Sequence, residues 1–244
     1  MSISDRQKQI LGILNERAYI TVNELSKITY TSPSSIRRDL SYLQNNRLVV
    51  RSHGGVTLPE PIRGVASFLD RTKKAITEKR KIAQKAATLL CDGQTIILDS
   101  SSTATFLLPY IAKLSGASIF TNNLVTAMNA IELGISTHCF GGHAKNGNFA
   151  LSGIETYRAL SNICADILFF SSQSLDKTGN ISDSTEEENF VRLLMLKSAK
   201  TSVFLCDSQK FDTTSNFKLC NLENISVAVF DKEFEGLKTT CKFL

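Results

Sequence analysis

Three short helical patterns follow one another within the first 45 residues, and they restrict the fold more than any other feature of the chain. The first helix is expected over residues 4–16 from the spacing of its apolar side chains. The second opens at Thr21, because Thr21 and Glu24 have the spacing of a capping box. The third is expected to begin with Ser32 as its N-cap and Pro33 in its first turn. Helices this short are stable only when their apolar stripes pack together, so the segment predicts a small three-helix unit.

The third helix is expected to have one buried face and one face open to a partner. Ile36, Leu40 and Leu43 fall at i, i+4 and i+7 and form the buried stripe. The opposite face carries two adjacent arginines among short hydroxyl side chains. Arginines reach phosphates and guanine edges, and small side chains permit close approach to a groove of DNA. The residues of this face that we expect to contact DNA are Ser32, Ser34, Ser35, Arg37 and Arg38.

A basic β-wing is expected after the third helix. Residues 48–51 have the pattern of a strand, 52–55 that of a tight turn and 56–58 that of a return strand. Arg51 and His53 lie in this wing, and we expect them to meet the DNA backbone. Three helices followed by a wing predict a winged helix-turn-helix that binds double-stranded operator DNA.

The charge of the chain is concentrated at its N-terminal end. Residues 1–81 carry 15 Lys and Arg against 7 Asp and Glu, a net charge of +8, whereas residues 82–244 carry 13 against 16, a net charge of −3. This asymmetry suits an N-terminal segment that binds a polyanion and a second domain that does not.

A chain of 244 residues is long enough for two domains. Two prolines and a glycine between residues 59 and 64 interrupt either kind of regular structure. We therefore predict a DNA-binding domain at residues 1–58, a linker and connecting helix at 59–76, and an α/β effector-sensing domain at 77–244.

The composition gives no sign of a membrane or secreted protein. No apolar run reaches the roughly 18 residues of a membrane helix, and the N-terminus lacks the apolar stretch of a signal peptide. We expect a cytoplasmic protein with no membrane partner. The cysteines lack the spacing of a metal site, and no metal or cofactor is expected. All six are interpreted as small buried hydrophobes: Cys91, Cys139, Cys164, Cys206, Cys220 and Cys241.

The larger domain alternates between apolar strands and helices. A charged helical stretch over residues 71–80 leads into it. Short apolar strands separated by helices predict a largely parallel sheet covered on both faces. The expected strands are 95–99, 118–121, 137–140, 165–171, 202–207 and 226–231, and the helices between them are 103–114, 123–133, 155–163 and 185–199.

Polar residues cluster where these strands end. Residues 99–103 follow the first strand and open a helix, and Lys210 comes shortly after the fifth. In open α/β sheets ligands bind at the carboxyl ends of strands, and the amides at the start of a helix suit a phosphate. We expect one anion-binding pocket formed by Asp99, Ser101, Ser102, Thr103, Thr121, Asn122, Gly141, Gly142 and Lys210.

The predicted DNA-binding domain resembles that of a known family. Residues 31–40, Thr-Ser-Pro-Ser-Ser-Ile-Arg-Arg-Asp-Leu, are similar to the recognition helix of the DeoR family of regulators. Residues 51–56, Arg-Ser-His-Gly-Gly-Val, resemble that family's wing, and Arg6 matches its first helix. The chain departs from the pattern at Arg47, where the family has glycine.

The resemblance continues through the larger domain, in motifs such as Glu78-Lys79 and Asp92-Gly93. It implies a sensor fold related to ribose-phosphate isomerases and CoA transferases, a phosphorylated sugar as effector, repression of sugar-metabolism genes, and a homodimer or homotetramer. Asp176 matches the family pattern, and with Asp99 it is expected to accept hydrogen bonds from sugar hydroxyls. Serine replaces the family's glycine at three positions near the pocket: Ser101, Ser171 and Ser174.

Two other functions stay open at this point. Asp176, Glu188 and Lys210 supply the residue types of isomerase chemistry, so the chain could be a sugar-phosphate enzyme with a DNA-binding appendage. The cysteines could instead make it a redox-responsive regulator. No spacing requires either role. The main prediction is a non-enzymatic, sequence-specific repressor that a phosphorylated sugar releases from its operator.

Overall fold

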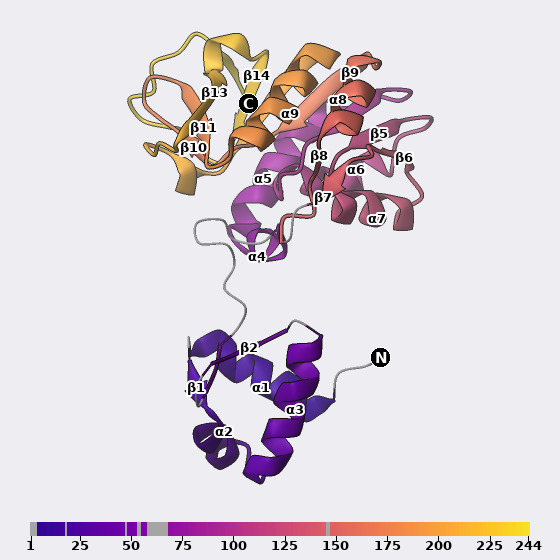
Figure 1. Ribbon diagram of the computed structural model, residues 1–244. Helices are drawn as coiled ribbons and strands as arrows, with labels where there is room; N and C mark the ends of the chain where they lie inside the picture. The colour runs from indigo at the N-terminus through magenta and orange to yellow at the C-terminus, as the bar shows by residue number, and fades with distance from the viewer. Residues whose placement is uncertain (1–3, 18, 47, 53–54, 58–67, 145–146) are drawn as a thin grey trace. The chain divides into compact units, whose positions relative to one another are not determined.

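The computed structural model divides the chain into two compact units, Met1–Gly64 and Val65–Leu244. It describes residues 4–17, 19–46, 48–52, 55–57, 68–144 and 147–244. Figure 1 labels many of the helices and strands of the two units. The domain boundaries expected at residues 58 and 76 stay predictions.

The small unit has the three helices and the wing that the sequence predicts. Ser4, Thr21 and Ser32 each cap a helix through a side-chain oxygen that accepts a hydrogen bond from a backbone N–H in the first turn. A further strand, which the sequence analysis did not predict, precedes the second helix and completes a three-stranded antiparallel sheet in the order β1-β3-β2. The elements are α1 (Asp5–Glu16), β1 (Ile20–Thr21), α2 (Val22–Ile28), α3 (Pro33–Asn45), β2 (Val50–Ser52) and β3 (Gly55–Thr57).

One apolar core holds the small unit together. Ile36, Leu40 and Leu43 of α3 are fully buried, as their spacing predicts, and they pack with residues of α1, α2 and the sheet. Burial of such side chains contributes about 1.5–3 kcal/mol each. Because the apolar side chains of α3 are buried in this core, its opposite face is open to a partner.

The large unit is built on a seven-stranded sheet in which every neighbouring pair of strands is parallel. The order along the sheet is β15-β14-β12-β9-β4-β5-β6. This confirms the predicted parallel α/β domain. The strands are β4 (Thr95–Leu98), β5 (Ser118–Thr121), β6 (Ser136–Cys139), β9 (Ala165–Phe170), β12 (Ala199–Cys206), β14 (Val227–Phe230) and β15 (Lys242–Phe243).

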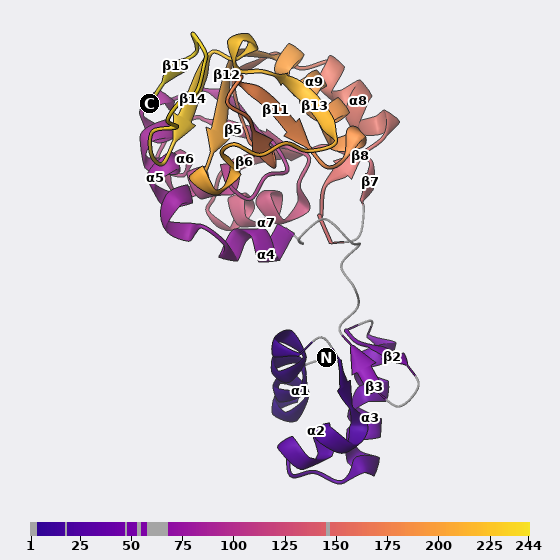
Figure 2. The same ribbon diagram turned by 90° about the vertical axis from the view of Figure 1, so that its left-hand side faces the viewer.

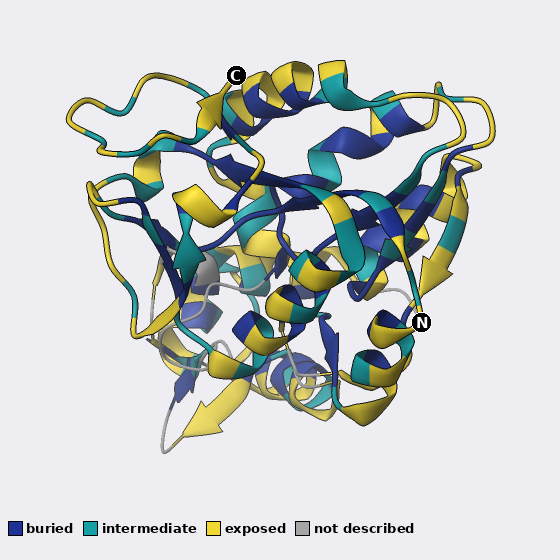
Figure 3. Ribbon diagram, turned by 90° about the horizontal axis from the view of Figure 1, so that it is seen from above, coloured by how far each residue is buried: buried dark blue, intermediate teal, exposed yellow. Residues whose placement is uncertain are grey.

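Helices cover both faces of this sheet and create two separate cores. Along β4, Ile96 and Leu98 point to one face and Ile97 to the other, because successive side chains of a strand alternate. Figure 3 shows the strands buried between helices whose outer sides are exposed. On one face lie α5 (Ile76–Ala86), α6 (Leu108–Ile111) and α7 (Leu124–Glu132), and on the other lie α8 (Ile154–Ser161) and α9 (Glu186–Ser198).

A second, antiparallel sheet packs beside α9 and was not predicted. Its strands are short and partly polar, so they lack the apolar pattern by which a strand is recognised. Figure 2 shows two of them side by side near the C-terminal strands. They are β10 (Ser174–Leu175), β11 (Asn180–Asp183) and β13 (Phe217–Asn221), and a further pair is formed by β7 (His143–Ala144) and β8 (Leu151–Ser152).

Three local expectations differ from the structure. The helix expected over 71–80 is broken into α4 (Phe68–Lys73) and α5, because Ala75 between them has a left-handed backbone with φ of 50°. The helix expected over 103–114 is a short 3-10 turn followed by α6. Most cysteines are not buried: Cys206 is, whereas Cys91, Cys139 and Cys164 are exposed and Cys220 and Cys241 are half-buried.

None of the helices in the described part of the chain is both long enough and apolar enough to cross a bilayer.

Candidate functional site

The N-terminal end of α3 presents a cluster of hydroxyl groups. The hydroxyl of Ser32 accepts a hydrogen bond from the backbone N–H of Ser35 at 3.3 Å. It also lies 3.0 Å from the hydroxyls of Ser34 and Ser35. Ser32 and Ser34 are exposed, and Ser35 is half-buried. A helix start with small polar side chains can approach the edges of bases closely.

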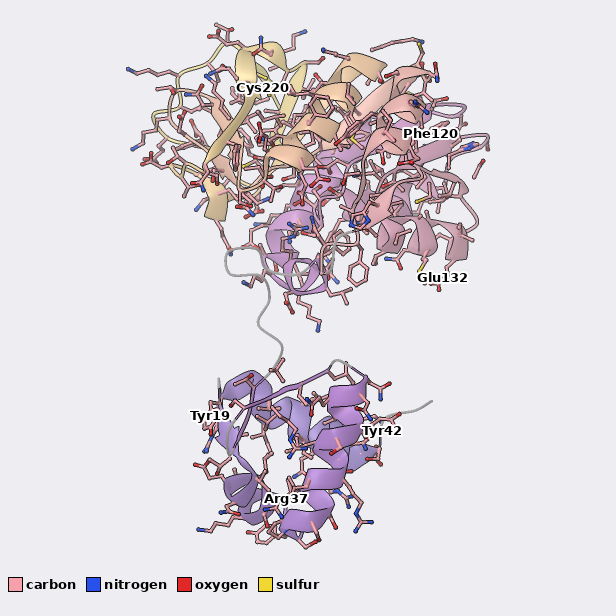
Figure 4. All side chains as sticks on the ribbon, viewed as in Figure 1. Tyr19, Arg37, Tyr42, Phe120, Glu132 and Cys220 are labelled. Carbon is pink, nitrogen blue, oxygen red and sulfur yellow. The ribbon has the colours of Figure 1, made fainter. Side chains whose placement is uncertain are left out.

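Positive charge lies along the rest of this exposed face. Arg37, labelled in Figure 4, and Arg38 are both exposed on α3. Arg51 of β2 donates a hydrogen bond to the hydroxyl of Ser41 at 3.2 Å, which ties the wing strand to α3. His53 lies outside the described residues. The described residues predicted to bind DNA therefore share α3 and the adjoining strand of one small unit.

An acidic residue on α3 was not singled out in the sequence. Asp39 is buried, and its carboxylate accepts hydrogen bonds from Arg6 Nε at 2.5 Å and Gln7 Nε2 at 3.2 Å. The hydrogen bond and charge of Asp39 raise the pKa of Arg6. These contacts fix α3 against α1. They also keep a negative charge off the face that carries the arginines.

The order in which the chain adds strands to the parallel sheet of the large unit reverses at β4. From β4 the chain adds β5 and β6 on one side, and it then returns to add β9, β12 and β14 on the other. Such a switch point leaves a crevice at the carboxyl ends of the two strands beside it. A cavity of about 230 Å³ lies there, lined by residues that follow β4, β9 and β12.

Four of the predicted effector residues line this cavity: Ser101, Ser102 and Thr103 after β4, and Lys210 after β12. Thr103 Oγ1 is buried and has no hydrogen-bond partner among the described residues. Lys210 donates a hydrogen bond to the Ser171 hydroxyl at 3.0 Å and forms an ion pair with Asp207 at 3.1 Å. Hydroxyls and an ammonium group around one cavity suit an anion.

The remaining predicted effector residues do not line the cavity. Asp176 instead accepts hydrogen bonds from Thr178 and Asn180 within the turn between β10 and β11. Gly142 permits close packing, because a Cβ there would lie 2.5 Å from the Ser152 carbonyl oxygen. Thr121, Asn122, Gly141 and Gly142 all lie at the ends of β5 and β6, on the other side of β4 from β9.

The carboxylate of Asp99 is engaged by groups of the protein itself. It is fully buried, and its carboxylate accepts hydrogen bonds from the backbone N–H of Ser101 at 3.0 Å and of Ser171 at 3.3 Å. It also accepts one from Arg192 Nε at 2.9 Å. The expectation that Asp99 meets sugar hydroxyls therefore differs from its observed place, which is beneath the loop that lines the cavity.

A buried arginine in the cavity wall joins three carboxylates. Arg192 of α9 pairs with Asp99 and Asp183 at 2.9 Å and with Glu188 at 3.2 Å. Burial alone would lower the pKa of Arg192, but Asp183, Asp99 and Glu188 outweigh burial and raise it. Sequence analysis did not single out Arg192. An arginine inside an otherwise amphipathic helix with acidic residues in its first turn is the only signal it offers.

Three further cations in the cavity wall, Lys79, Arg71 and the exposed Lys74, were not predicted as site residues. Lys79 is buried and donates hydrogen bonds to the Ser102 hydroxyl at 3.1 Å and to the Arg71 carbonyl oxygen. Burial lowers the pKa of Lys79, the positive charges of Lys210 and Arg71 lower it further, and the resulting pKa is about 8. Burial also lowers the pKa of Arg71, whose Nη2 donates to Asn148 Oδ1. All three precede β4 in the chain, outside the strand-end loops from which the pocket was predicted.

The serines that replace glycine near the pocket need no unusual backbone. The non-glycine residues with positive φ are Tyr30, Ala75, Phe149 and Asp212 among those described, so Ser101, Ser171 and Ser174 are not strained. Ser101 Oγ accepts a hydrogen bond from the N–H of Ala104.

Comparison with known proteins finds matches to both units. Residues 6–61 match the family model described as a DeoR-like helix-turn-helix domain, and residues 74–232 the one described as a DeoR C terminal sensor domain. The HTH-type transcriptional regulator GolR of Listeria innocua is 34% identical over 94% of this chain and 91% of its own length. The lactose phosphotransferase system repressor of Staphylococcus aureus is 26% identical over 99% and 97%. Ribose 5-phosphate isomerase from Plasmodium falciparum aligns with a TM-score of 0.41 at 20% identity, covering 56% of this chain and 52% of that one.

Substitution of Arg192 by methionine should destabilise the large unit by about 3–5 kcal/mol, because the buried carboxylates of Asp99 and Asp183 and the half-buried one of Glu188 would lose their shared partner. Thermal unfolding followed by calorimetry measures the change. Arg158→Met on α8 is the matched control, since Arg158 is exposed, and it should stay within about 0.5 kcal/mol of the wild type. Equal stability of the two variants would contradict the structural role of Arg192.

Proposed function

Because the chain belongs to the DeoR family of DNA-binding transcriptional regulators, we propose that it represses sugar-metabolism genes until a phosphorylated sugar occupies the cavity of its large unit. The observation that carries this proposal is one cavity that gathers Lys79, Lys210, Arg71 and the Thr103 hydroxyl, which has no hydrogen-bond partner among the described residues. Deletion of the gene should raise transcription beside the sites that the protein binds. A fall in transcription would instead make the chain an activator.

The family argues against one alternative that the sequence left open, a sugar-phosphate enzyme with a DNA-binding appendage. The relatives are named as transcriptional regulators and not as enzymes, and the resemblance that the motifs indicated is confirmed. The two carboxylates that line the cavity are Asp183 and Asp207, and each already forms an ion pair with a cation of the cavity wall, Asp183 with Arg192 and Asp207 with Lys210. At Cys206 and Cys220 a redox function has little support, since burial raises the pKa of these two thiols to about 12.

We propose that operator binding uses the exposed face of α3 and the wing. Arg37 and Arg38 would contact the major groove and its phosphates, with Arg51 and His53 on the adjacent backbone. Ser34 and Ser35, near the start of α3, would read base edges, so their substitution would alter base preference more than overall affinity.

Replacing Arg37 and Arg38 together by alanine should weaken binding to all DNA sequences. Each lost phosphate contact should lower the slope of log affinity against log salt by roughly 1. Fluorescence anisotropy with a DNA fragment that the protein retains from genomic DNA, measured at several salt concentrations, gives both quantities. Lys197→Ala, which removes an exposed charge from the large unit, is the control. Wild-type affinity of the double variant at moderate salt would refute the assignment.

We propose that the effector's phosphate is held by the amides and hydroxyls of Ser101–Thr103, with Lys210 supplying positive charge. Hydroxyl groups of the sugar would then face the polar side chains of the cavity, including Gln173 and Gln209. The resemblance of the whole chain to regulators of sugar operons supports a sugar as the remainder of the ligand. No cofactor or metal enters this proposal.

A panel of hexose and pentose phosphates should contain a ligand that binds by calorimetry and weakens operator binding roughly 5- to 150-fold. The unphosphorylated sugars should not bind, because the cavity cations would lack their partner. Lys210→Ala should weaken the phosphosugar by about tenfold or more. Lys232→Ala, outside the cavity lining, should leave it unchanged. Equal affinity for a sugar and its phosphate would eliminate the phosphate site.

Phosphosugar affinity should fall as the pH rises above about 8. The pKa of Lys79 is about 8 in the empty cavity, and a nearby anion favours the charged lysine and so raises that pKa. Binding should therefore take up protons near pH 8, and above it affinity should fall by up to about tenfold per pH unit. The ligand itself stays a dianion, since the second pKa of a phosphate ester is about 6. Calorimetry in two buffers of different ionisation enthalpy counts the protons. Lys79→Arg should flatten the profile.

We propose that the protein acts as a homodimer or homotetramer joined mainly through residues 65–244. One winged helix offers a small DNA interface, so useful affinity requires two copies linked together. Sedimentation at micromolar concentration should give a dimer or larger species. A monomeric full-length protein would contradict this proposal.

A further inference from the structure

Helix α4 occupies a distinctive place in the chain and in the cavity. It is the first helix described after residues 58–67, which connect it along the sequence to the small unit. Arg71 in α4 and Lys74 and Ala75 directly after it line the cavity at the switch point. Part of the wall of the proposed ligand site is thus formed by the first described segment of the large unit that follows the DNA-binding unit in the chain.

Phe68 and Arg71 are two of the residues that hold this helix on the large unit. Phe68 is fully buried, and its N–H donates to the Gly147 carbonyl oxygen at 2.9 Å. Arg71 donates to Asn148 Oδ1, and its carbonyl oxygen accepts from Lys79 Nζ. The left-handed backbone of Ala75, unfavourable for a residue with a Cβ, follows directly. A helix of six residues with these contacts belongs to the less stable parts of a fold.

Donors on the cavity side of α4 are not fully used. Arg71 Nε is buried with no hydrogen-bond partner in the part of the chain that the structure describes. The Lys79 ammonium has three N–H donors and gives two of them to protein oxygens, those of Ser102 and Arg71. The Thr103 hydroxyl is also buried without a partner among the described residues. These three groups lie on different segments around the same cavity.

We propose that an anion in the cavity completes the hydrogen bonds of Arg71 and Lys79 and thereby locks α4 onto the large unit, and that this locking changes the affinity for DNA. The inference rests on the proposed function, because it assigns a route by which that ligand acts. Arg71 can keep its Nη2 bond to Asn148 while Nε donates to the anion, and Lys79 can keep both of its bonds. Occupancy therefore adds contacts to α4 without removing any.

The coupling follows from a difference in affinity between two states. In the docked state α4 lies on the large unit as in the structure, and in the undocked state it has left that place. The undocked state lacks Arg71 at the cavity and therefore binds the anion more weakly. The ligand then shifts the population towards the docked state. By linkage, operator DNA must weaken ligand binding by the same factor that the ligand weakens DNA binding.

The test uses the full-length protein, the tightest-binding phosphosugar of the panel, and inorganic phosphate as a second probe. Hydrogen exchange of the peptide spanning residues 68–75 is measured with and without each probe at saturation. Operator affinity is measured in parallel with and without the phosphosugar. Arg71→Gln removes Nε and the charge, and Arg71→Lys keeps the charge but removes Nε, so one of them remains informative if the other does not fold. Lys73→Gln changes an exposed charge on the same helix and is the control.

In the wild type and in Lys73→Gln, the probes should slow exchange of this peptide about tenfold or more. In the Arg71 variants, phosphosugar affinity should fall about tenfold or more. When saturated with phosphosugar, these variants should show little slowing of exchange. The factor by which the phosphosugar lowers their operator affinity should be at least fivefold smaller than in the wild type. Phosphosugar binding to the wild type without slower exchange, or full coupling in saturated Arg71 variants, overturns this inference and leaves the proposed function standing. Absence of any phosphosugar binding to the wild type overturns both.

Discussion

The large unit depends on one buried interaction, the pairing of Arg192 with three carboxylates that come from different parts of the fold. Asp99 follows the central strand β4, Asp183 ends β11 of the small sheet, and Glu188 lies one turn before Arg192 in α9. The guanidinium therefore fastens the main sheet, the second sheet and a covering helix at one point. Since a single charge balances several of opposite sign, the cluster has an excess of negative charge, and the cations of the neighbouring cavity wall lie next to it.

That excess explains how several positive groups can lie so close together. Arg71 is attracted by Glu188, Asp183 and Asp99 although burial opposes its charge, and Lys210 has Asp207 beside it. Lys79 is the exception, because the nearby cations and its own burial both disfavour its charged form. A change in charge within the cavity therefore alters the protonation of Lys79, whose pKa is about 8. The switch point at β4 thus provides the crevice, and the acidic cluster stabilises cations around it.

Much of the fold could be predicted from the sequence, whereas only part of the site could. Capping residues such as Thr21 and Ser32 and the apolar stripe of α3 are local signals, so the helices of the small unit were placed correctly. The order of strands is not local, and nothing in the sequence shows that β9 lies between β4 and β12. Loops after β5 and β6 were therefore assigned to a pocket that lies on the other side of β4. The polar strands β10, β11 and β13 were missed because they lack alternation, and Arg71 and Lys79 were missed as site residues because they precede the first strand of the sheet.

The contact between Arg51 of the wing strand and Ser41 of α3 has a consequence for the shape of DNA that the protein accepts. Together with the sheet that anchors β2, it holds the wing and the helix at a fixed separation. If α3 and β2 keep a fixed separation when they bind, they cannot adjust to the groove, and the duplex has to adjust to them. Sequences whose grooves already have the matching width, or whose base steps deform easily, pay the smaller elastic penalty. Part of the selectivity would then arise at base pairs that no side chain touches.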